Sequence, residues 1–198
     1  MLQIILLIPK PAKYVRKIKL YIASSLDNFI ASENGSIEWL FSDADYGYAR
    51  FYDSIDTILV GRKTYEQSLT FDEYPYRGKK VYVFTHNSKA ESKKKRMPGV
   101  EYSDNNILDS VRRLTQERIS NKDIWLLGGG EIVSILLNAD LVDEIILSIH
   151  PIILGRGIPL FKNIEKRINL RLKGSVPFES GLVQLCYRII SLEDPIML

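Results

Sequence analysis

Two places where an apolar, strand-like run ends at glycine and a helical pattern follows directly constrain the fold of this chain most. Residues 57–60 read Thr-Ile-Leu-Val and are followed by Gly61. Residues 124–127 read Ile-Trp-Leu-Leu and are followed by Gly128, Gly129 and Gly130. Short runs that are almost wholly apolar are typical of strands buried in a parallel sheet, whose two faces are both covered. The two segments therefore predict an α/β fold.

The rest of the sequence continues the alternation of strands and helices, which implies a mostly parallel sheet covered on both faces. Near the end of the chain, a turn around Pro177 and Gly181 separates two strand-like segments and predicts an antiparallel hairpin on the sheet edge. The remaining expected strands are residues 19–23, 80–85, 144–149, 169–173 and 182–190, and the expected helices are residues 43–54, 63–69, 105–119 (capped by Asp104) and 131–138.

A length of 198 residues suits one domain and allows a sizeable apolar core. No internal repeat, low-complexity tract or linker divides the sequence. We therefore assign residues 18–191 to the domain, residues 1–17 to an N-terminal extension and residues 192–198 to a tail. The apolar segment 2–8 is short and has no Lys or Arg before it, so we expect neither a cleavable signal nor a membrane span there.

Each glycine turn has the chemistry of an anion site. A helix start offers free backbone N–H groups, and glycines let a phosphate come close to them. After Gly61, the side chains of Arg62, Lys63 and Thr64 suit a phosphate monoester such as the 2′-phosphate of NADPH. Taken alone, the first turn is equally compatible with solvated basic residues, and the second with a tight turn that holds no ligand. Two such turns on parallel strands of one sheet can hold the two ends of one dinucleotide.

Other chemistries have weaker support in the sequence. There is no G-x-S-x-G nucleophile turn, and the spacing of His86, His150 and Cys186 fits no metal site. A single cysteine allows no intramolecular disulfide, so a reducing cytoplasm is the simplest location. The net charge of +3 suits an anionic small molecule and does not by itself indicate nucleic acid. The basic run at residues 91–96 favours a solvated loop over a phosphate-binding patch.

In this order, the motifs resemble the dihydrofolate reductase-like superfamily, and more closely its branch with the riboflavin-biosynthesis reductase domain. The resemblance runs from about residue 17 to residue 190. The segments that carry it are residues 25–31 (SLDNFIA), 58–66 (ILVGRKTYE), 126–130 (LLGGG) and, most specifically, 149–161 (IHPIILGRGIPLF).

The resemblance implies a three-layer fold with a mixed, mostly parallel sheet, a C-terminal antiparallel hairpin and NADPH as the hydride donor. It also implies a cis peptide between the first two glycines of the second turn, and a homodimer by analogy with relatives. The residues that match the family's cofactor contacts are Ala23, Ile30, Gly61, Arg62, Lys63, Thr64, Thr85, His86, Gly128, Gly129, Gly130, Glu131 and Ile132.

The substrate side carries fewer matches. Asp45, with Asp43 as the alternative, matches the acid that does the proton work in the folate enzymes, although it can equally cap a helix. Asp27 either orders a loop or contacts substrate, and Asn28 stands where the family has glycine. Trp39 and Tyr48 are expected to border the substrate.

Two departures separate the possible substrates. Lys79, with Arg77 nearby, stands where folate enzymes use arginine to hold the substrate's glutamate, which weakens the folate reading. The deaminase domain that riboflavin enzymes often carry has no counterpart here. We therefore expect an NADPH-dependent reductase of the riboflavin type, resembling 5-amino-6-(5-phosphoribosylamino)uracil reductase, which transfers hydride to a pyrimidine- or pterin-type substrate. In the pyrimidine case it would reduce the opened ribose to the ribityl chain. A dihydrofolate reductase and a non-catalytic NADPH-binding protein of the same fold are the alternatives.

Overall fold

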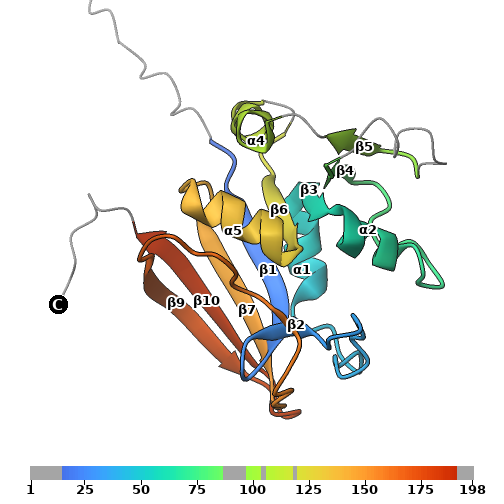
Figure 1. The fold of residues 1–198 in the computed structure, drawn as a ribbon, viewed down its shortest axis with the longest axis vertical. Coiled ribbons are helices and arrows are strands. Elements are labelled where there is room, and N and C mark those ends of the chain that lie inside the picture. The colour runs from blue at the N-terminus through green and yellow to red at the C-terminus, as the bar shows by residue number, and fades with distance from the viewer. Residues whose placement is uncertain (1–14, 87–96, 104–105, 118–119, 191–198) are drawn as a thin grey trace, which may run out of the picture.

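The computed structural model describes residues 15–86, 97–103, 106–117 and 120–190 (Figure 1). The strands of its main sheet are β1 (Ile18–Ser25), β3 (Ile55–Gly61), β4 (Lys80–Phe84), β5 (Val100–Ser103), β6 (Asp123–Gly128), β7 (Glu144–His150), β9 (Asn169–Pro177) and β10 (Val183–Ile190). The helices are α1 (Tyr48–Ser54), α2 (Arg62–Ser68), α4 (Ile107–Gln116) and α5 (Gly130–Asn138).

The main sheet has the strand order β5-β4-β3-β6-β1-β7-β10-β9. The six strands from β5 to β7 pair in parallel. β10 then pairs antiparallel with β7, and β9 pairs antiparallel with β10 at the edge. The mixed, mostly parallel sheet and the C-terminal hairpin confirm the fold class expected from the sequence.

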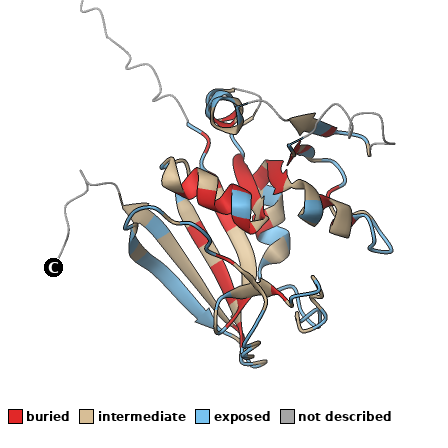
Figure 2. Cartoon of the chain, in the orientation of Figure 1, coloured by how far each residue is buried: buried red, intermediate tan, exposed pale blue. Residues whose placement is uncertain are grey.

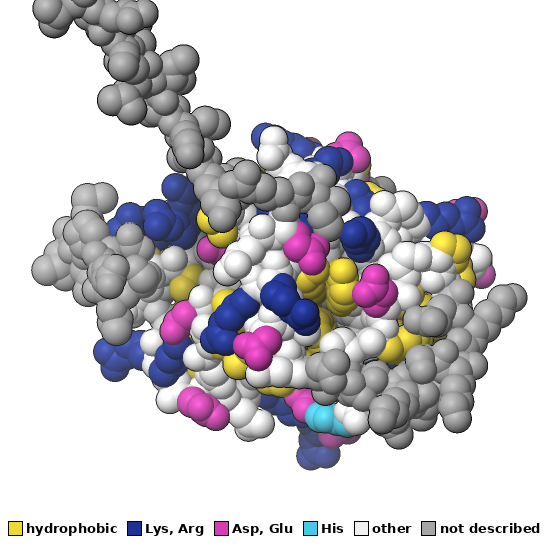
Figure 3. Space-filling model, turned by 90° about the horizontal axis from the view of Figure 1, so that it is seen from above, with side chains coloured by type: hydrophobic (Ala, Val, Ile, Leu, Met, Phe, Trp, Pro, Cys, Tyr) yellow, Lys and Arg dark blue, Asp and Glu magenta, His cyan; other side chains and the backbone are white. Residues whose placement is uncertain are grey.

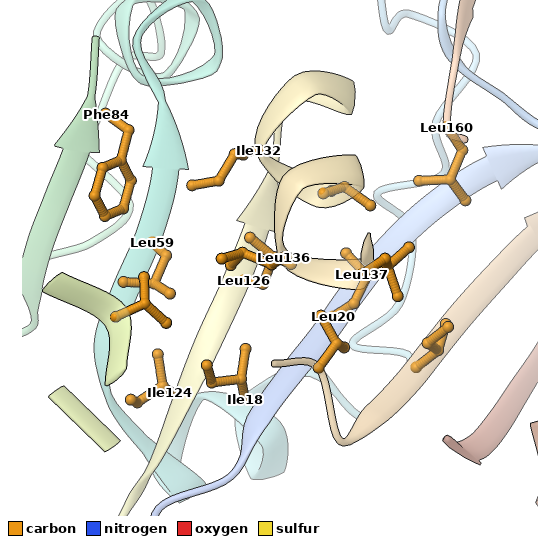
Figure 4. Packing of buried hydrophobic residues seen from close by; sticks show 14 of the residues in the cluster. Ile18, Leu20, Leu59, Phe84, Ile124, Leu126, Ile132, Leu136, Leu137 and Leu160 are labelled. Carbon is orange, nitrogen blue, oxygen red and sulfur yellow. The ribbon is translucent and has the colours of Figure 1, made fainter. Parts of the chain in front are cut away.

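Alternating side chains of the central strands build a separate core on each face of the sheet. Leu126 of β6 points to the face covered by α5, where Leu136 and Leu137 of that helix pack against it (Figure 4). Its neighbour Trp125 belongs to the opposite core, with Phe51 of α1. The molecule therefore has three layers. Buried residues concentrate in the central strands and α5, whereas β9 is exposed over most of its length (Figure 2).

Two helices begin later than the sequence pattern suggested. The expected helix at residues 43–54 is α1, which starts only at Tyr48. Tyr46 and Gly47 before it both have positive φ, 50° and 79°, a conformation that an α-helix does not contain. The expected helix at residues 105–119 is α4, whose cap is Asn106 with its side chain accepting from the Asp109 N–H. Asp104 and the run 91–96 lie outside the described residues.

Three short strands were not anticipated. β5 adds a strand to the sheet, while β2 (Phe29–Ala31) and β8 (Ile158–Pro159) form a two-stranded antiparallel ribbon. Strands of two to four residues carry too little periodicity to be recognised from sequence. The ribbon matters for the site, because it fixes the segment around Ile30 next to the carboxyl end of the sheet.

The folded domain begins before residue 18. Arg16 is 1% exposed, and the Lys17 N–H donates to Asp123 Oδ1 at 2.9 Å. These two residues, which we assigned to the extension, are thus part of the domain. Residues 1–14 and 191–198 lie outside the described residues.

Candidate functional site

The two glycine turns lie side by side at the carboxyl ends of neighbouring strands. Val60 of β3 pairs with Gly128 of β6, so the turns that follow each strand meet. A Cβ atom added to Gly129 would stand 3.5 Å from the Cα of Gly61 and 3.5 Å from Thr64 Oγ1. Gly129 also has φ +95°, which L side chains rarely adopt. The distances are those of ordinary van der Waals contact, so it is the backbone angle that favours glycine at this position, whether or not a ligand binds.

A cavity of about 1070 Å³ opens over the two turns. It is large compared with most small-molecule pockets, which hold roughly 300–1,000 Å³. All thirteen residues expected to contact the cofactor line it, although they come from β1, β2, the ends of β3 and β6, α2, α5 and the segments after β4 and β6. These are Ala23, Ile30, Gly61, Arg62, Lys63, Thr64, Thr85, His86, Gly128, Gly129, Gly130, Glu131 and Ile132.

The loop between β2 and α1 forms another wall of this first cavity. Glu33, Asn34, Gly35, Ile37 and Leu40 all line it. The loop is tied to α2, because Gln67 Nε2 donates to the Gly35 carbonyl at 3.0 Å. The floor is the amino end of α5, whose first-turn N–H groups and helix dipole favour an anion.

Two basic side chains on the first cavity, Arg62 and His86, lie next to carboxylates. Arg62 Nη1 lies 2.7 Å from Glu66 Oε2, one helical turn further on. His86 Nε2 lies 3.2 Å from Glu131 Oε1, so this pair joins the segment after β4 to the start of α5. The Arg62–Glu66 pair is partly exposed, and pairs of this kind are worth little in stability, so a phosphate can take over the guanidinium at small cost.

Elsewhere on the surface the charges are mixed. Where Figure 3 shows side chains, Lys and Arg are interspersed with Asp and Glu over the face seen from above. Among the residues that the structure describes, this face therefore offers no continuous basic strip of the kind that follows a nucleic-acid backbone.

The cis peptide expected between Gly128 and Gly129 is not found, because every peptide bond of the described segments is trans. The chain instead turns through positive φ at both residues, 139° at Gly128 and 95° at Gly129. Only glycine adopts such angles easily, so the two glycines make the turn without isomerisation.

A second, smaller cavity of about 270 Å³ adjoins the first. Ala23 and Leu40 line both, so the two cavities meet at these residues. The other residues of the second cavity are Tyr21, Phe41, Ala44, Asp45, Tyr46, Tyr48, Ser148, His150 and Leu182. The second cavity thus brings together aromatic rings, one carboxylate and a neutral hydroxyl beside Ala23, the expected nicotinamide contact.

Asp45 and Tyr48, expected on the substrate side, both line this second cavity. Asp45 is exposed and lies before α1, whereas the expected helix at residues 43–54 would have contained it. Its Oδ1 accepts the Ala49 N–H at 2.8 Å, which anchors the carboxylate at the start of α1. Tyr48 is half-buried, and this burial raises the pKa of its hydroxyl above the ordinary value, so the phenol stays protonated.

Asp27 has the loop-ordering geometry and lines neither cavity. Its Oδ1 accepts from Ser25 Oγ at 2.6 Å and from the Leu154 N–H at 3.1 Å, and its Oδ2 accepts from the Gly155 N–H at 2.8 Å. The bond from Ser25, followed by those from the two backbone N–H groups, lowers the pKa of this carboxyl. Asp27 therefore joins the turn after β1 to the loop after β7.

His150 is a residue of this site that the sequence reading passed over. It ends β7 and is 3% exposed. Its ring contacts Trp39 edge-on, with centroids 5.3 Å apart, and Phe41 at 5.0 Å. Trp39, expected to border the substrate, thus lies against the second cavity through His150. The signal that could have revealed His150 was its place at the start of the segment 149–161, the most specific of the motifs.

Lys79 serves the fold rather than either cavity. Its Nζ donates to the carbonyls of Tyr52 and Ile55, each at 2.8 Å, and lies 4.1 Å from the centre of the Tyr52 ring. The ammonium thus caps the carboxyl end of α1. Neither Lys79 nor Arg77 is among the residues that line the two cavities.

Within residues 15–86, 97–103, 106–117 and 120–190, no group of three or more His, Cys, Asp or Glu side chains is placed to hold a metal ion. No helix in these same ranges is long and apolar enough to cross a membrane.

Comparisons with known proteins point to one family. Residues 75–184 match the family model described as the RibD C-terminal domain. A protein of Bacillus subtilis (strain 168), named "Uncharacterized protein YyaP", is 37% identical over 179 residues, which cover 87% of this chain and 94% of YyaP.

Solved structures share the fold over most of the chain. A Shewanella sp. PV-4 protein named "Putative riboflavin biosynthesis protein" superposes with a TM-score of 0.74 at 25% identity, covering 88% of this chain and 99% of the other. A Thermotoga maritima protein superposes with a TM-score of 0.68 at 17% identity, over 89% of this chain and 57% of its own length. Its name is diaminohydroxyphosphoribosylaminopyrimidine deaminase/5-amino-6-(5-phosphoribosylamino)uracil reductase.

Proposed function

Because the chain belongs to the family of the RibD C-terminal domain, we propose that it is an NADPH-dependent reductase that passes hydride to a pyrimidine- or pterin-type substrate. In a 5-phosphoribosylamino-pyrimidine the hydride would go to the imine carbon of the opened ribose. The observation that carries the proposal is the junction of the two cavities at Ala23 and Leu40. A cofactor along the first cavity would end where an acceptor in the second begins. The names of the Shewanella and Thermotoga proteins support riboflavin-type reduction.

The first cavity fits a phosphorylated dinucleotide. Arg62, Lys63 and Thr64 would hold the 2′-phosphate, since a guanidinium beside a hydroxyl suits a phosphate monoester. The amino end of α5, from Gly130, would hold the pyrophosphate on its N–H groups. Ala23 and Ile30 would meet the nicotinamide carboxamide. NADPH supplies the hydride when bound, and the chain's residues orient it and shield it from water.

The second cavity fits a flat heterocycle. The rings of Tyr21 and Tyr48 offer apolar faces to stack on, and the Ser148 hydroxyl can donate to a ring carbonyl. Asp45 would accept ring N–H groups and assist protonation. The bond from Ala49 uses only its Oδ1, so the carboxylate is anchored without engaging Oδ2.

Within this proposal, the 5-phosphoribosylamino-pyrimidine type of acceptor is favoured over dihydrofolate. Folate enzymes need a cation for the glutamate carboxylate of the substrate. Lys79 would have to leave two carbonyls and the Tyr52 ring to provide it. Turnover of NADPH with dihydrofolate, compared with a 5-amino-6-(5-phosphoribosylamino)uracil, separates the two. Tight NADPH binding with neither substrate reduced would favour the non-catalytic alternative.

Changing Arg62 to Ala should weaken NADPH binding by about 1–3 kcal/mol, because a charged hydrogen bond to the 2′-phosphate is lost. Binding of NADH, which lacks that phosphate, should change little. Titration of cofactor fluorescence with both nucleotides measures the difference. Arg50→Ala is the matched control, since Arg50 lies on α1 and lines neither cavity. Equal losses for NADPH and NADH would contradict the assignment of Arg62.

A further inference from the structure

His150, which lines the second cavity, makes contacts through both of its imidazole nitrogens. The Phe41 N–H donates to His150 Nε2 at 3.2 Å. On the other side of the ring, Nδ1 lies 3.3 Å from the Ser148 carbonyl. A carbonyl oxygen can only accept, so Nδ1 carries the proton and Nε2 is the bare acceptor that the Phe41 N–H requires. The neutral Nδ1–H tautomer therefore satisfies both contacts.

Protonation of the ring would break one of these contacts. In the imidazolium form both nitrogens carry hydrogen, so Nε2–H would face the N–H of Phe41. Two donors cannot bond to each other, and burial leaves little water to take their place. The segment Trp39–Phe41 would then keep its ring packing on His150 and the bond from the Leu40 N–H to the Ile37 carbonyl, but it would lose its bond to the imidazole.

The segment pinned in this way borders both cavities. Leu40 lines the two of them, Phe41 lines the second, and the rings of Trp39 and Phe41 both pack on the His150 ring. We infer that neutral His150 is a positioning residue, which pins residues 39–41 at the junction of the cavities and releases them when it is protonated. The consequence for hydride transfer rests on the proposed function, whereas the pinning itself does not.

The surroundings of His150 set the pH at which its ring is protonated and residues 39–41 are released. Burial lowers the pKa of His150 below its ordinary value of 6.5, and the hydrogen bonds to backbone carbonyls only partly oppose this shift. The titratable groups of the same cavity are Tyr21 on β1, Asp45 and Tyr46 on the loop before α1, and Tyr48 on α1. The pKa of each of these three tyrosines is raised, so none of them changes its charge in acid.

The lowered pKa of His150 makes the folded protein less stable in acid. Because the folded protein favours the neutral ring, the unfolded chain binds more protons between the lowered pKa and 6.5. The contribution of His150 to stability is therefore fully present above about pH 6.5 and is lost as the pH falls through the folded pKa.

The direct test is an NMR and fluorescence titration of the ligand-free protein. The backbone N–H signal of Phe41 and the fluorescence of Trp39 should change together, with one midpoint below pH 6.5. A protonated imidazole next to an indole ring alters the emission of that indole, and Trp39→Phe identifies which of the two tryptophans responds. Absence of a change at Phe41 between about pH 4 and pH 8 would overturn the inference.

Two variants test whether the titration seen at Phe41 belongs to His150 or to another group. His150→Gln keeps an acceptor near the position of Nε2 and has no titration, so Phe41 should stay pinned at every pH. His150→Phe keeps the ring contacts but has no acceptor, so the signals should match the acid form of the natural protein at every pH. Persistence of the original midpoint in His150→Gln would assign the titration to another group and refute the role of His150.

Activity gives a separate readout. With NADPH saturating, acidification should raise KM for the acceptor by about two- to tenfold, the range expected for one lost hydrogen bond, and His150→Gln should flatten that rise. If no acceptor is reduced, the proposed function fails while the Phe41 titration still decides the pinning.

Discussion

Replacing Arg16 with alanine is expected to lower the free energy of unfolding by about 3–5 kcal/mol, which is the usual cost of removing one partner of a buried ion pair. Arg16 is 1% exposed, and its guanidinium contacts the Asp56 carboxylate. A loss of this size is a large fraction of the stability of a typical domain. Urea unfolding followed by circular dichroism measures it.

The expected size comes from the number of segments that Arg16 joins. Its Nη2 donates to Thr57 Oγ1 at 2.8 Å and its Nε donates to the Lys122 carbonyl at 2.9 Å. Nη1 donates to the Leu114 carbonyl, in the last turn of α4, at 3.3 Å. Alanine would leave the Asp56 carboxylate without its cation and these acceptors without their donor.

An exposed ion pair of the same type provides the control. Arg112 Nη1 lies 3.5 Å from Asp109 Oδ1 on α4, and both side chains are more than half exposed. Arg112→Ala should therefore change stability by no more than about 0.5 kcal/mol. If Arg16→Ala cost no more than Arg112→Ala, the buried pair would make no net contribution, and its desolvation would offset its bonds.

Arg16 is also an example of a buried residue that could not be predicted from the sequence. Its side-chain partners lie 40 to 106 residues away along the chain. A basic residue before the first strand looks like part of a polar extension, and no local pattern marks it as buried. Periodicity reports which face of an element is apolar, whereas a buried cation depends on partners that only the fold brings together.

The two cavities also differ in how far they could be predicted from the sequence, for the same reason. The lining of the first cavity could be predicted because each turn is local: a buried strand, a glycine and a helix start follow one another within about ten residues. The second cavity depends on the contact between Phe41 and His150, which are 109 residues apart. The prediction that Asp45 lies within a helix was also wrong. The positive φ of Tyr46 delays the start of α1, so Asp45 comes before it.

The motif at residues 149–161 was recognised by resemblance, and the structure gives a physical reason for one of its glycines. A Cβ atom added to Gly157 would stand 2.3 Å from the Ala31 carbonyl oxygen and 3.1 Å from Phe29 Cβ. Both belong to β2, which pairs with β8 directly after Gly157. Since the φ of Gly157 lies outside the left-handed region, close approach alone excludes a side chain there.

Gly157→Ala is therefore expected to destabilise the protein by about 3 kcal/mol or more, since backbone cannot move away as a flexible side chain can. Displacing β2 would also move Ile30, which lines the first cavity and is the expected carboxamide contact. We expect the affinity for NADPH to fall by at least about tenfold, which corresponds to a loss of roughly 1.4 kcal/mol of binding free energy. Urea unfolding and cofactor fluorescence measure the two effects on one preparation.

Gly174→Ala is the matched control for this substitution. Gly174 lies in β9, has no positive φ, and a Cβ atom there would meet nothing within 4 Å. It should therefore be neutral or stabilise the protein by up to about 1 kcal/mol, because alanine restricts the unfolded chain. If Gly157→Ala matched this control in stability and in NADPH affinity, β2 would not be fixed by the close approach, and the ribbon of β2 and β8 would have no part in shaping the cofactor site.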